Sequence, residues 1–438
     1  MNQSYKKAFI VLTSLFFTWG LLTVLVDFLI PRLREIFELS YFQAGLVQFA
    51  FFMAFFFVSI PAGKLLHKIG YKKGIMLGLG IMGLGCLLFL PAASMRLFWL
   101  FMLGYFTLAA GITILQVAAN PYVTILGDPK TASSRLNLAQ AFNSLGTTIA
   151  PILGAIYLLS DDIRTSDQIS KLDDEAIDLY YASEASAVQS PFLFLAIALI
   201  LLTVFVLLIK LPKLLDTESP SNYGDALKDK KLVLGAIGIF VYVGAEVAIG
   251  SFAVNYFSEM GLESVVRANP TMNSIAEFIA NLFGKNISIM DGKGVLGLFL
   301  TFYWGGAMIG RFIGSILTAK YKPNKILSLF ATLAILFVGI SMSTTGLVAM
   351  WSIIAVGLFN SIMFPTIFSI AIEDLGDLKP QGSGILCTAI AGGAIIPPLY
   401  GLFTDNAGFK IAFLLVIACY AYILFYGRKS LQLTAEKN

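Results

Sequence analysis

Charged side chains are scarce in this chain: Asp, Glu, Lys and Arg together make up 13% of its 438 residues. A soluble domain carries about a quarter. Apolar residues reach 58%, and the mean hydropathy is +0.82. This balance excludes an ordinary soluble domain and predicts an all-α integral membrane protein, with the lipid bilayer as its surroundings. The net charge is +4 and the basic residues sit in short loops, so we expect no nucleic-acid partner.

Histidine and cysteine are also scarce. His67 is the single histidine, and it lies in a basic loop. The three cysteines, Cys86, Cys387 and Cys419, lie inside apolar runs without the spacing of metal ligands, which is typical of small buried side chains. We therefore expect no resident cofactor and no enzyme chemistry based on histidine or thiolate clusters.

Long apolar runs, in contrast, fill most of the chain. A spanning helix needs about 20 mainly apolar residues, and the sequence offers twelve such runs. We expect spans near residues 8–31, 43–66, 74–93, 98–126, 135–159, 190–210, 231–258, 294–318, 324–344, 347–372, 383–403 and 409–427. In the loop 260–293, the apolar segment 275–283 predicts a further short helix.

The connecting loops alternate in charge. Lys and Arg gather on one side, for example at Lys64–Lys73 and Lys320–Lys325, whereas the loop 160–189 on the other side is rich in Asp and Glu. The positive-inside rule then places both termini and the central loop in the cytoplasm. We expect a multi-pass protein of a bacterial inner membrane, acting as a monomer.

The chain divides into halves of six spans. We expect an N-terminal bundle over 1–210, a cytoplasmic linker over 211–230 and a C-terminal bundle over 231–438. The halves share spaced patterns: Gln116 precedes Pro121 by five residues, as Asn360 precedes Pro365. Internal repeats with a binding site at their interface are a recurrent transporter design, so two pseudo-symmetric bundles are predicted.

Two carboxylates lie inside spans that otherwise carry no charge. Asp27 interrupts the run Phe9–Ile30, and Glu246 interrupts Leu232–Phe257. A charged group near the middle of a bilayer costs about 2.5–3.5 kcal/mol on insertion scales, and such groups usually face a wet cavity where they bind something. The pair predicts a protein that moves a polar solute across the membrane.

Amides and aromatic residues extend this candidate site. The predicted solute ligands are Asp27, Gln116, Asn120, Gln140, Asn143, Glu246, Asn360, Trp19 and Trp304. Amides and carboxylates match the donors and acceptors of sugar hydroxyls, and aromatic rings can stack on the apolar face of a sugar. The alternative is that the amides hold helices together in lipid, where each bond gives about 0.6–2 kcal/mol.

Asp27 has three readings. With a pKa raised by desolvation it would pick up and release a proton, and left ionised it would bind Na⁺ with neighbouring oxygens. Either would couple solute movement to an ion gradient, and Glu246 is the second candidate for this coupling. The third reading is a fixed ion pair, but the only basic residue well inside a span is Arg311, which we expect to stabilise the cytoplasmic closure.

Five sequence motifs stand out: Trp19-Gly20 with Asp27 and Pro31, then Phe42–Gln48, Ala118–Val123, Arg135–Ser144 and Phe364–Ser369. Together they resemble the L-fucose–proton symporter group of the major facilitator superfamily. The resemblance covers nearly the whole chain. It implies a twelve-helix major facilitator fold, alternating access and a sugar bound between the halves. It assigns Asp27 to the family's essential first-helix carboxylate, and Gln140 and Asn143 to its sugar-contacting amides.

Two positions depart from the fucose symporter pattern: Gln116 stands where that group has a second titratable acid, and Glu246 stands where it has an amide. In the loop Gly63–Lys73, which is similar to the superfamily's basic loop between spans two and three, His67 stands where that motif usually has an acid. The exchange at Gln116 and Glu246 resembles the glucose/galactose branch, which includes carriers driven by Na⁺. We therefore expect a hexose symporter driven by Na⁺ or H⁺. A carrier for fucose or another monosaccharide with protons, or for a non-sugar solute, remains the alternative.

Overall fold

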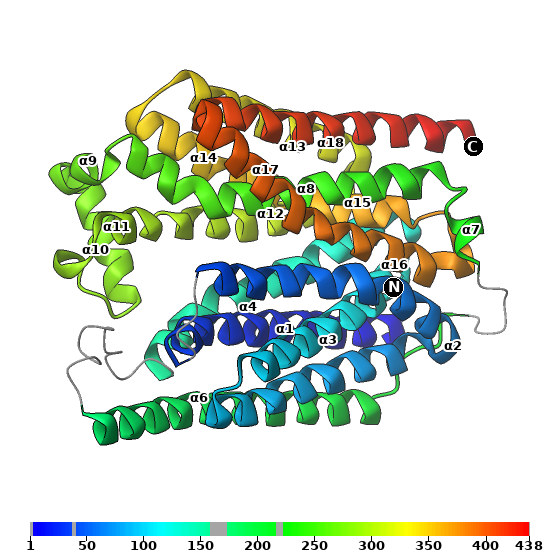
Figure 1. Ribbon diagram of the computed structural model, residues 1–438. Coiled ribbons are helices and arrows are strands. Elements are labelled where there is room, and N and C mark those ends of the chain that lie inside the picture. Colours follow the sequence, from blue (N-terminus) through cyan, green and yellow to red (C-terminus); the bar gives the residue numbers. More distant parts are fainter. Residues whose placement is uncertain (1–2, 37–40, 158–172, 216–221, 438) are drawn as a thin grey trace.

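The computed structural model describes the chain except residues 1–2, 37–40, 158–172, 216–221 and 438 (Figure 1). The helices before the linker are α1 Gln3–Ile36, α2 Tyr41–Met95, α3 Phe98–Ile125, α4 Ala132–Tyr157 and α6 Asp174–Leu208. Those after it are α7 Tyr223–Ala226, α8 Lys230–Glu259, α9 Leu262–Ala268, α10 Pro270–Leu282, α11 Gly292–Leu298, α12 Leu300–Lys320, α13 Pro323–Ser343, α14 Gly346–Asn360, α15 Met363–Ala371, α16 Lys379–Thr388, α17 Gly392–Ala407 and α18 Phe409–Lys437. Within the described residues there is no strand.

The described helices provide the twelve expected crossings. Ten segments are long and apolar enough to cross a membrane. One of them, Phe49–Met95, has 47 residues, and Gly70 inside it has φ 79° and ψ 164°, which breaks it into two crossings. The remaining crossing is α4, whose apolar run is interrupted by amides and hydroxyls. The twelve-helix prediction is confirmed.

The crossings form two layers. In Figure 1, α1, α2, α3, α4 and α6 make the blue-to-green layer, and α8 to α18 make the green-to-red layer. Within the first layer α2 packs on α3 and α6, and α1 packs on α4. Within the second, α13 packs on α18, α12 on α14, and α8 on α17. The boundary predicted within 211–230 stays a prediction, because residues 216–221 lie outside the described part.

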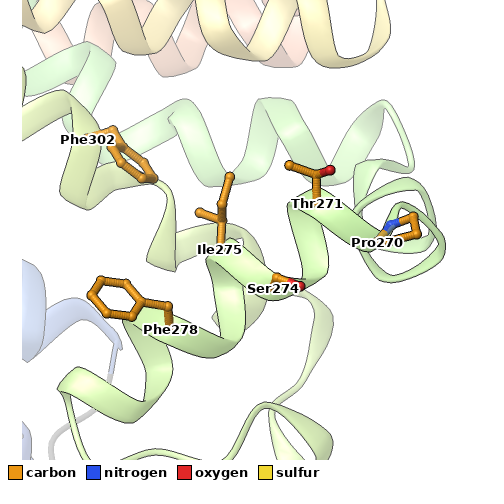
Figure 2. A pocket seen from close by; sticks show the side chains of 6 residues that line it. All are labelled: Pro270, Thr271, Ser274, Ile275, Phe278 and Phe302. Carbon is orange, nitrogen blue, oxygen red and sulfur yellow. The ribbon is translucent and has the colours of Figure 1, made fainter.

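The two ends of the molecule differ. The start of α1, α7 and the end of α18 lie at one end, which we call the terminal face, and α9 and α10 lie at the opposite end (Figure 1). The helix expected near 275–283 is α10, which begins after Asn269, whose Oδ1 accepts a hydrogen bond from the Met272 N–H at 3.1 Å. A cavity of about 520 Å³ lies between α10 and Phe302 of α12, and Figure 2 shows Ile275, Phe278 and Phe302 around it.

Two glycines let α1 and α4 approach at backbone distance. A Cβ at Gly20 would lie 2.4 Å from the carbonyl oxygen of Asn143, and one at Gly146 would lie 2.2 Å from that of Phe17. Small residues at helix interfaces allow this close packing in membranes. The contact fixes the two predicted site helices of the N-terminal bundle against each other.

This packing gives the first prediction. Gly146→Ala places a methyl group against the backbone of α1 at Phe17, so we expect it to lower the free energy of unfolding by about 1–3 kcal/mol through overpacking. Thermal unfolding of the purified protein measures the loss. Gly80→Ala is the matched control, since a Cβ there has no neighbour within 4 Å. An equal unfolding temperature for both variants would contradict the packing argument.

Candidate functional site

Glu246 lies in the middle of α8 and is held by a neighbouring tyrosine. The hydroxyl of Tyr242, one turn earlier, donates to Glu246 Oε1 at 2.7 Å. The positive charge of Arg311 on α12 also acts on this carboxylate, although the described residues contain no ion pair between them within 4 Å. One carboxylate oxygen thus has a fixed donor, while the group as a whole keeps capacity to accept further hydrogen bonds.

Asn360 lies in a closed network beside this carboxylate. Its Nδ2 donates to the hydroxyl of Tyr303 at 2.6 Å, and its Oδ1 accepts from the hydroxyl of Tyr420 at 2.6 Å. All three side chains are fully buried. In this conformation both ends of the Asn360 amide are occupied, which favours the helix-holding reading over direct sugar contact.

The two predicted tryptophans lie in different surroundings. Trp304 is 46% exposed, its ring meets that of Tyr303 edge-on at 5.0 Å, and its indole edge borders Gly250, one turn beyond Glu246 on α8. Trp19 is only 5% exposed and packs against Phe16 in the core. The structure therefore leaves Trp304, but not Trp19, exposed, beside the helix turn that follows Glu246.

The amides of the N-terminal bundle lie on α3 and α4. Gln140 Nε2 donates to Asn120 Oδ1 at 3.3 Å, and Asn143 Nδ2 donates to the Phe16 carbonyl at 2.9 Å. Asn120 is fully buried, and its Nδ2 has no hydrogen-bond partner among the described residues. Gln116 lies one turn from Asn120, is half-buried and makes no hydrogen bond within the described part. These groups retain donors and acceptors that a polar ligand can use.

Asp27 lies in α1, and its side chain is outside the described residues. Helical periodicity puts position 27 on the face of Gly20, which touches Asn143 of α4. The predicted roles of Asp27 in sugar binding, proton coupling or Na⁺ binding stay predictions. Among the described residues, no group of three His, Cys, Asp or Glu side chains could hold a metal ion.

Prolines free two backbone carbonyls where the bundles meet. A proline has no N–H, so Pro121 leaves the Val117 carbonyl without its helical partner, and Pro365 does the same to Ser361. The hydroxyl of Ser383, from the other bundle, donates to the Val117 carbonyl at 2.8 Å. The matching Ser361 carbonyl accepts from Arg311 Nε at 3.1 Å. The repeated Gln/Asn-to-Pro spacing thus supplies acceptors at corresponding places in the two halves.

Arg311 also joins the two bundles. Its second nitrogen, Nη1, donates to Ser144 Oγ, directly beside Asn143 on α4. Further hydrogen bonds between the bundles join Ser133 to Ser369 at 2.5 Å and Asn137 Nδ2 to Thr366 Oγ1 at 3.1 Å. From Arg311 these contacts continue toward the terminal face. The described parts of the bundles are therefore closed together at that face, with Glu246 and the α4 amides on either side of the innermost contact.

The sequence reasoning missed some members of the site. Tyr242 and Tyr420 were not predicted, and neither was Ser144 as the partner of Arg311. The spacing of four between Tyr242 and Glu246 was a usable signal, because it puts both on one helix face. No such signal exists for Tyr420, which is 60 residues from Asn360. The cavity at α10 and a second one at the terminal face are not lined by the predicted sugar ligands.

Comparison with known proteins places these features in a family. The model of the Major Facilitator Superfamily matches residues 8–397. A glucose/galactose transporter of Brucella abortus is 48% identical over 97% of this chain and 94% of its own length. An L-fucose-proton symporter of Escherichia coli is 34% identical over 98% and 94%. The solved structure of the transporter FucP in the outward conformation superposes with a TM-score of 0.86 at 33% identity, covering 98% of this chain and 99% of that one.

The Asn360 network gives the second prediction. Asn360→Leu keeps a similar volume but leaves two buried tyrosine hydroxyls without their partner, at about 1–3 kcal/mol for each unsatisfied group. We expect a lower thermal unfolding temperature even without any ligand. Gln116→Leu is the control, because Gln116 makes no hydrogen bond among the described residues. Equal stability of the two variants would contradict the helix-holding role of Asn360 and favour direct contact with the sugar.

Proposed function

Since this chain belongs to the major facilitator superfamily, we propose that it is a secondary symporter that carries a hexose of the glucose/galactose type into the cell together with a cation. The observation that carries the proposal is Glu246: a carboxylate inside a spanning helix, held by Tyr242 and one helix turn from Gly250, which borders the exposed Trp304. The Brucella abortus relative, named as a glucose/galactose transporter, supports the substrate class.

We assign the sugar to the space between the two bundles. Glu246 accepts hydroxyls of the sugar and Trp304 stacks on its apolar face, from the C-terminal bundle. Gln116, Asn120, Gln140 and Asn143 contribute amide donors and acceptors from the N-terminal bundle, and Asp27 couples the sugar to Na⁺ or H⁺. Asn360 acts by positioning Tyr303 and Tyr420. We infer that this conformation is the one open on the opposite side, because the contacts of Arg311 join the bundles toward the terminal face and the similar FucP structure is in the outward conformation.

The terminal face is the cytoplasmic one in this proposal. Its loops carry the lysine clusters that the positive-inside rule assigns to the cytoplasm, and both termini lie there. The carrier works in a bacterial inner membrane as a monomer. Transport then requires that the sugar and the cation together release the closure at this face and close the opposite one.

A fucose–proton symporter is the second candidate. It is supported by the 34% identity to the L-fucose-proton symporter and by the carboxylate at Asp27. Two positions separate the candidates. The fucose symporter pattern has an acid at the position of Gln116 and an amide at the position of Glu246, and this chain has the reverse. A carrier for a non-sugar solute has no specific feature in its favour.

Uptake in proteoliposomes tests the function and is the third prediction. Uptake of labelled glucose is measured with a Na⁺ gradient and, separately, with a pH gradient across the membrane. We expect accumulation with one of the two gradients, and we expect unlabelled glucose and galactose to compete for uptake. Asp27→Asn is expected to abolish uphill accumulation while exchange of sugar persists, because the carboxylate that couples the cation is gone. Full gradient-driven accumulation by this variant, or strong competition by fucose alone, would refute the assignment.

Glu246→Gln is the fourth prediction. Replacing the carboxylate removes a charged acceptor, and hydrogen bonds to charged groups are worth about 1.5–3 kcal/mol, so we expect sugar affinity to fall by roughly 10- to 100-fold. Titration calorimetry measures it. The control is Glu259→Gln, at the end of α8 away from Tyr242. Unchanged affinity with lost accumulation would move Glu246 from sugar binding to ion coupling alone.

A further inference from the structure

A groove crosses the boundary between the two bundles at the terminal face. It has a volume of about 730 Å³, within the range of pockets that hold small molecules. The N-terminal bundle lines it with the end of α3 and the turn into α4, and the C-terminal bundle with the turn from α12 to α13 and the ends of α15, α16 and α18. A molecule bound there would contact both halves at once.

Four lysines line this groove: Lys130 from the N-terminal bundle, and Lys320, Lys322 and Lys379 from the C-terminal bundle. One acid lies in the lining, Glu373, whose carboxylate is 3.5 Å from the ammonium group of the buried Lys231, and Asp374 and Asp377 also act on Lys379. Within the described part of the chain, Lys130, Lys320 and Lys322 take part in no ion pair. The groove therefore carries a surplus of positive charge.

Neutral groups of the groove suit an anion as well. Ser133 and Ser369 lie in its wall and bond to each other across the two bundles at 2.5 Å. The helix α13 begins in the groove at Pro323, without a side-chain cap on its first N–H groups. The dipole at a helix start adds to the positive potential made by the lysines.

From these observations we infer that the groove binds a phosphate-bearing anion, and that the bound anion stabilises the closure of the two bundles at the terminal face. Lys130 repels Lys320 and Lys322 when the bundles meet, because like charges at short range oppose each other. A phosphate group between them removes this repulsion. When the bundles separate at this face, the lysines of the two halves move apart and the site is lost.

The consequence is regulation of transport from the side of the terminal face. Under the proposed alternating access, an anion that holds this face closed slows the step in which the carrier opens there. The volume fits a nucleotide or a sugar phosphate, and a lipid headgroup would present the same phosphate chemistry. Sugar itself is not a ligand of this site.

The fifth prediction uses the three buried cysteines, which a thiol-reactive dye reaches only on unfolding. ATP, glucose 6-phosphate and inorganic phosphate are titrated into the purified protein at constant ionic strength. We expect the unfolding temperature to rise with ligand concentration. In the triple variant Lys130→Gln, Lys320→Gln, Lys322→Gln, the half-saturating concentration should increase by roughly tenfold or more, about 1.4 kcal/mol of binding.

The matched control is the triple variant Lys210→Gln, Lys213→Gln, Lys230→Gln, which removes the same charge at the same face outside the groove. It should bind like the wild type. Equal weakening in both triple variants, or no effect of any phosphate compound at millimolar concentration, would overturn the inference. A shift given only by vesicles of anionic lipid, and lost in the groove variant, identifies the phosphate as a lipid headgroup.

A transport readout separates this inference from the proposed function. Sugar exchange across proteoliposomes should slow when the effective phosphate compound is present on the side of the terminal face, and the groove variant should resist it. The thermal readout needs no sugar, so it stands if the hexose assignment fails. Binding without any effect on exchange would overturn the claim that the anion holds the closure.

Discussion

The structure depends on the requirement that every backbone carbonyl inside a membrane finds a hydrogen-bond donor. Pro121 and Pro365 each break that rule within their own helix, at corresponding places of the two halves. The carbonyls they free, at Val117 and Ser361, are bound by Ser383 and Arg311. One of these bonds crosses between the bundles directly, and the other holds the arginine that reaches Ser144 across the boundary. A local defect in each helix thus becomes a means of joining the halves.

This arrangement is suited to a carrier because many of the contacts between the bundles are hydrogen bonds between polar side chains. Serine–serine, amide–hydroxyl and arginine–serine contacts close the terminal face, together with apolar contacts such as that of Phe142 with Phe312. Large buried aromatic and aliphatic side chains fill the interior of each bundle. Hydrogen bonds of this kind contribute about 1 kcal/mol each, so water can replace them when the bundles part. The apolar interiors of the bundles stay intact during such a motion, since separating them would expose far more surface.

The candidate site follows the same division of labour. Glu246 and Trp304 lie on one bundle, the amides of α3 and α4 lie on the other, and Arg311 links the two groups near the innermost contact. The groove at the terminal face is also formed by residues of both bundles, but its main groups are the charged side chains of lysines. The candidate site and the groove both change shape when the bundles move relative to each other. A ligand bound at either of them therefore influences the relative position of the two bundles.

The sequence by itself determined the membrane class, the twelve crossings, the two halves and the short helix within the loop 260–293. These follow from hydropathy, periodicity and proline spacing, which are local properties of the chain. It also identified the polar residues inside spans, since charge in an apolar run needs no coordinates to be noticed. The alternatives for each amide could not be separated, because a ligand and a helix-holding side chain have the same composition.

Only the tertiary structure decided which partners those polar groups have. Asn360 and Tyr420 meet across 60 residues, and Arg311 and Ser144 across 167, so no spacing rule links them. The same holds for Trp19, which packing places in the core, and for Trp304, which it leaves open beside Gly250. The reason is physical: hydropathy fixes which segments enter the membrane, but side-chain contacts depend on how the helices pack, and that is set by the whole set of neighbours at once.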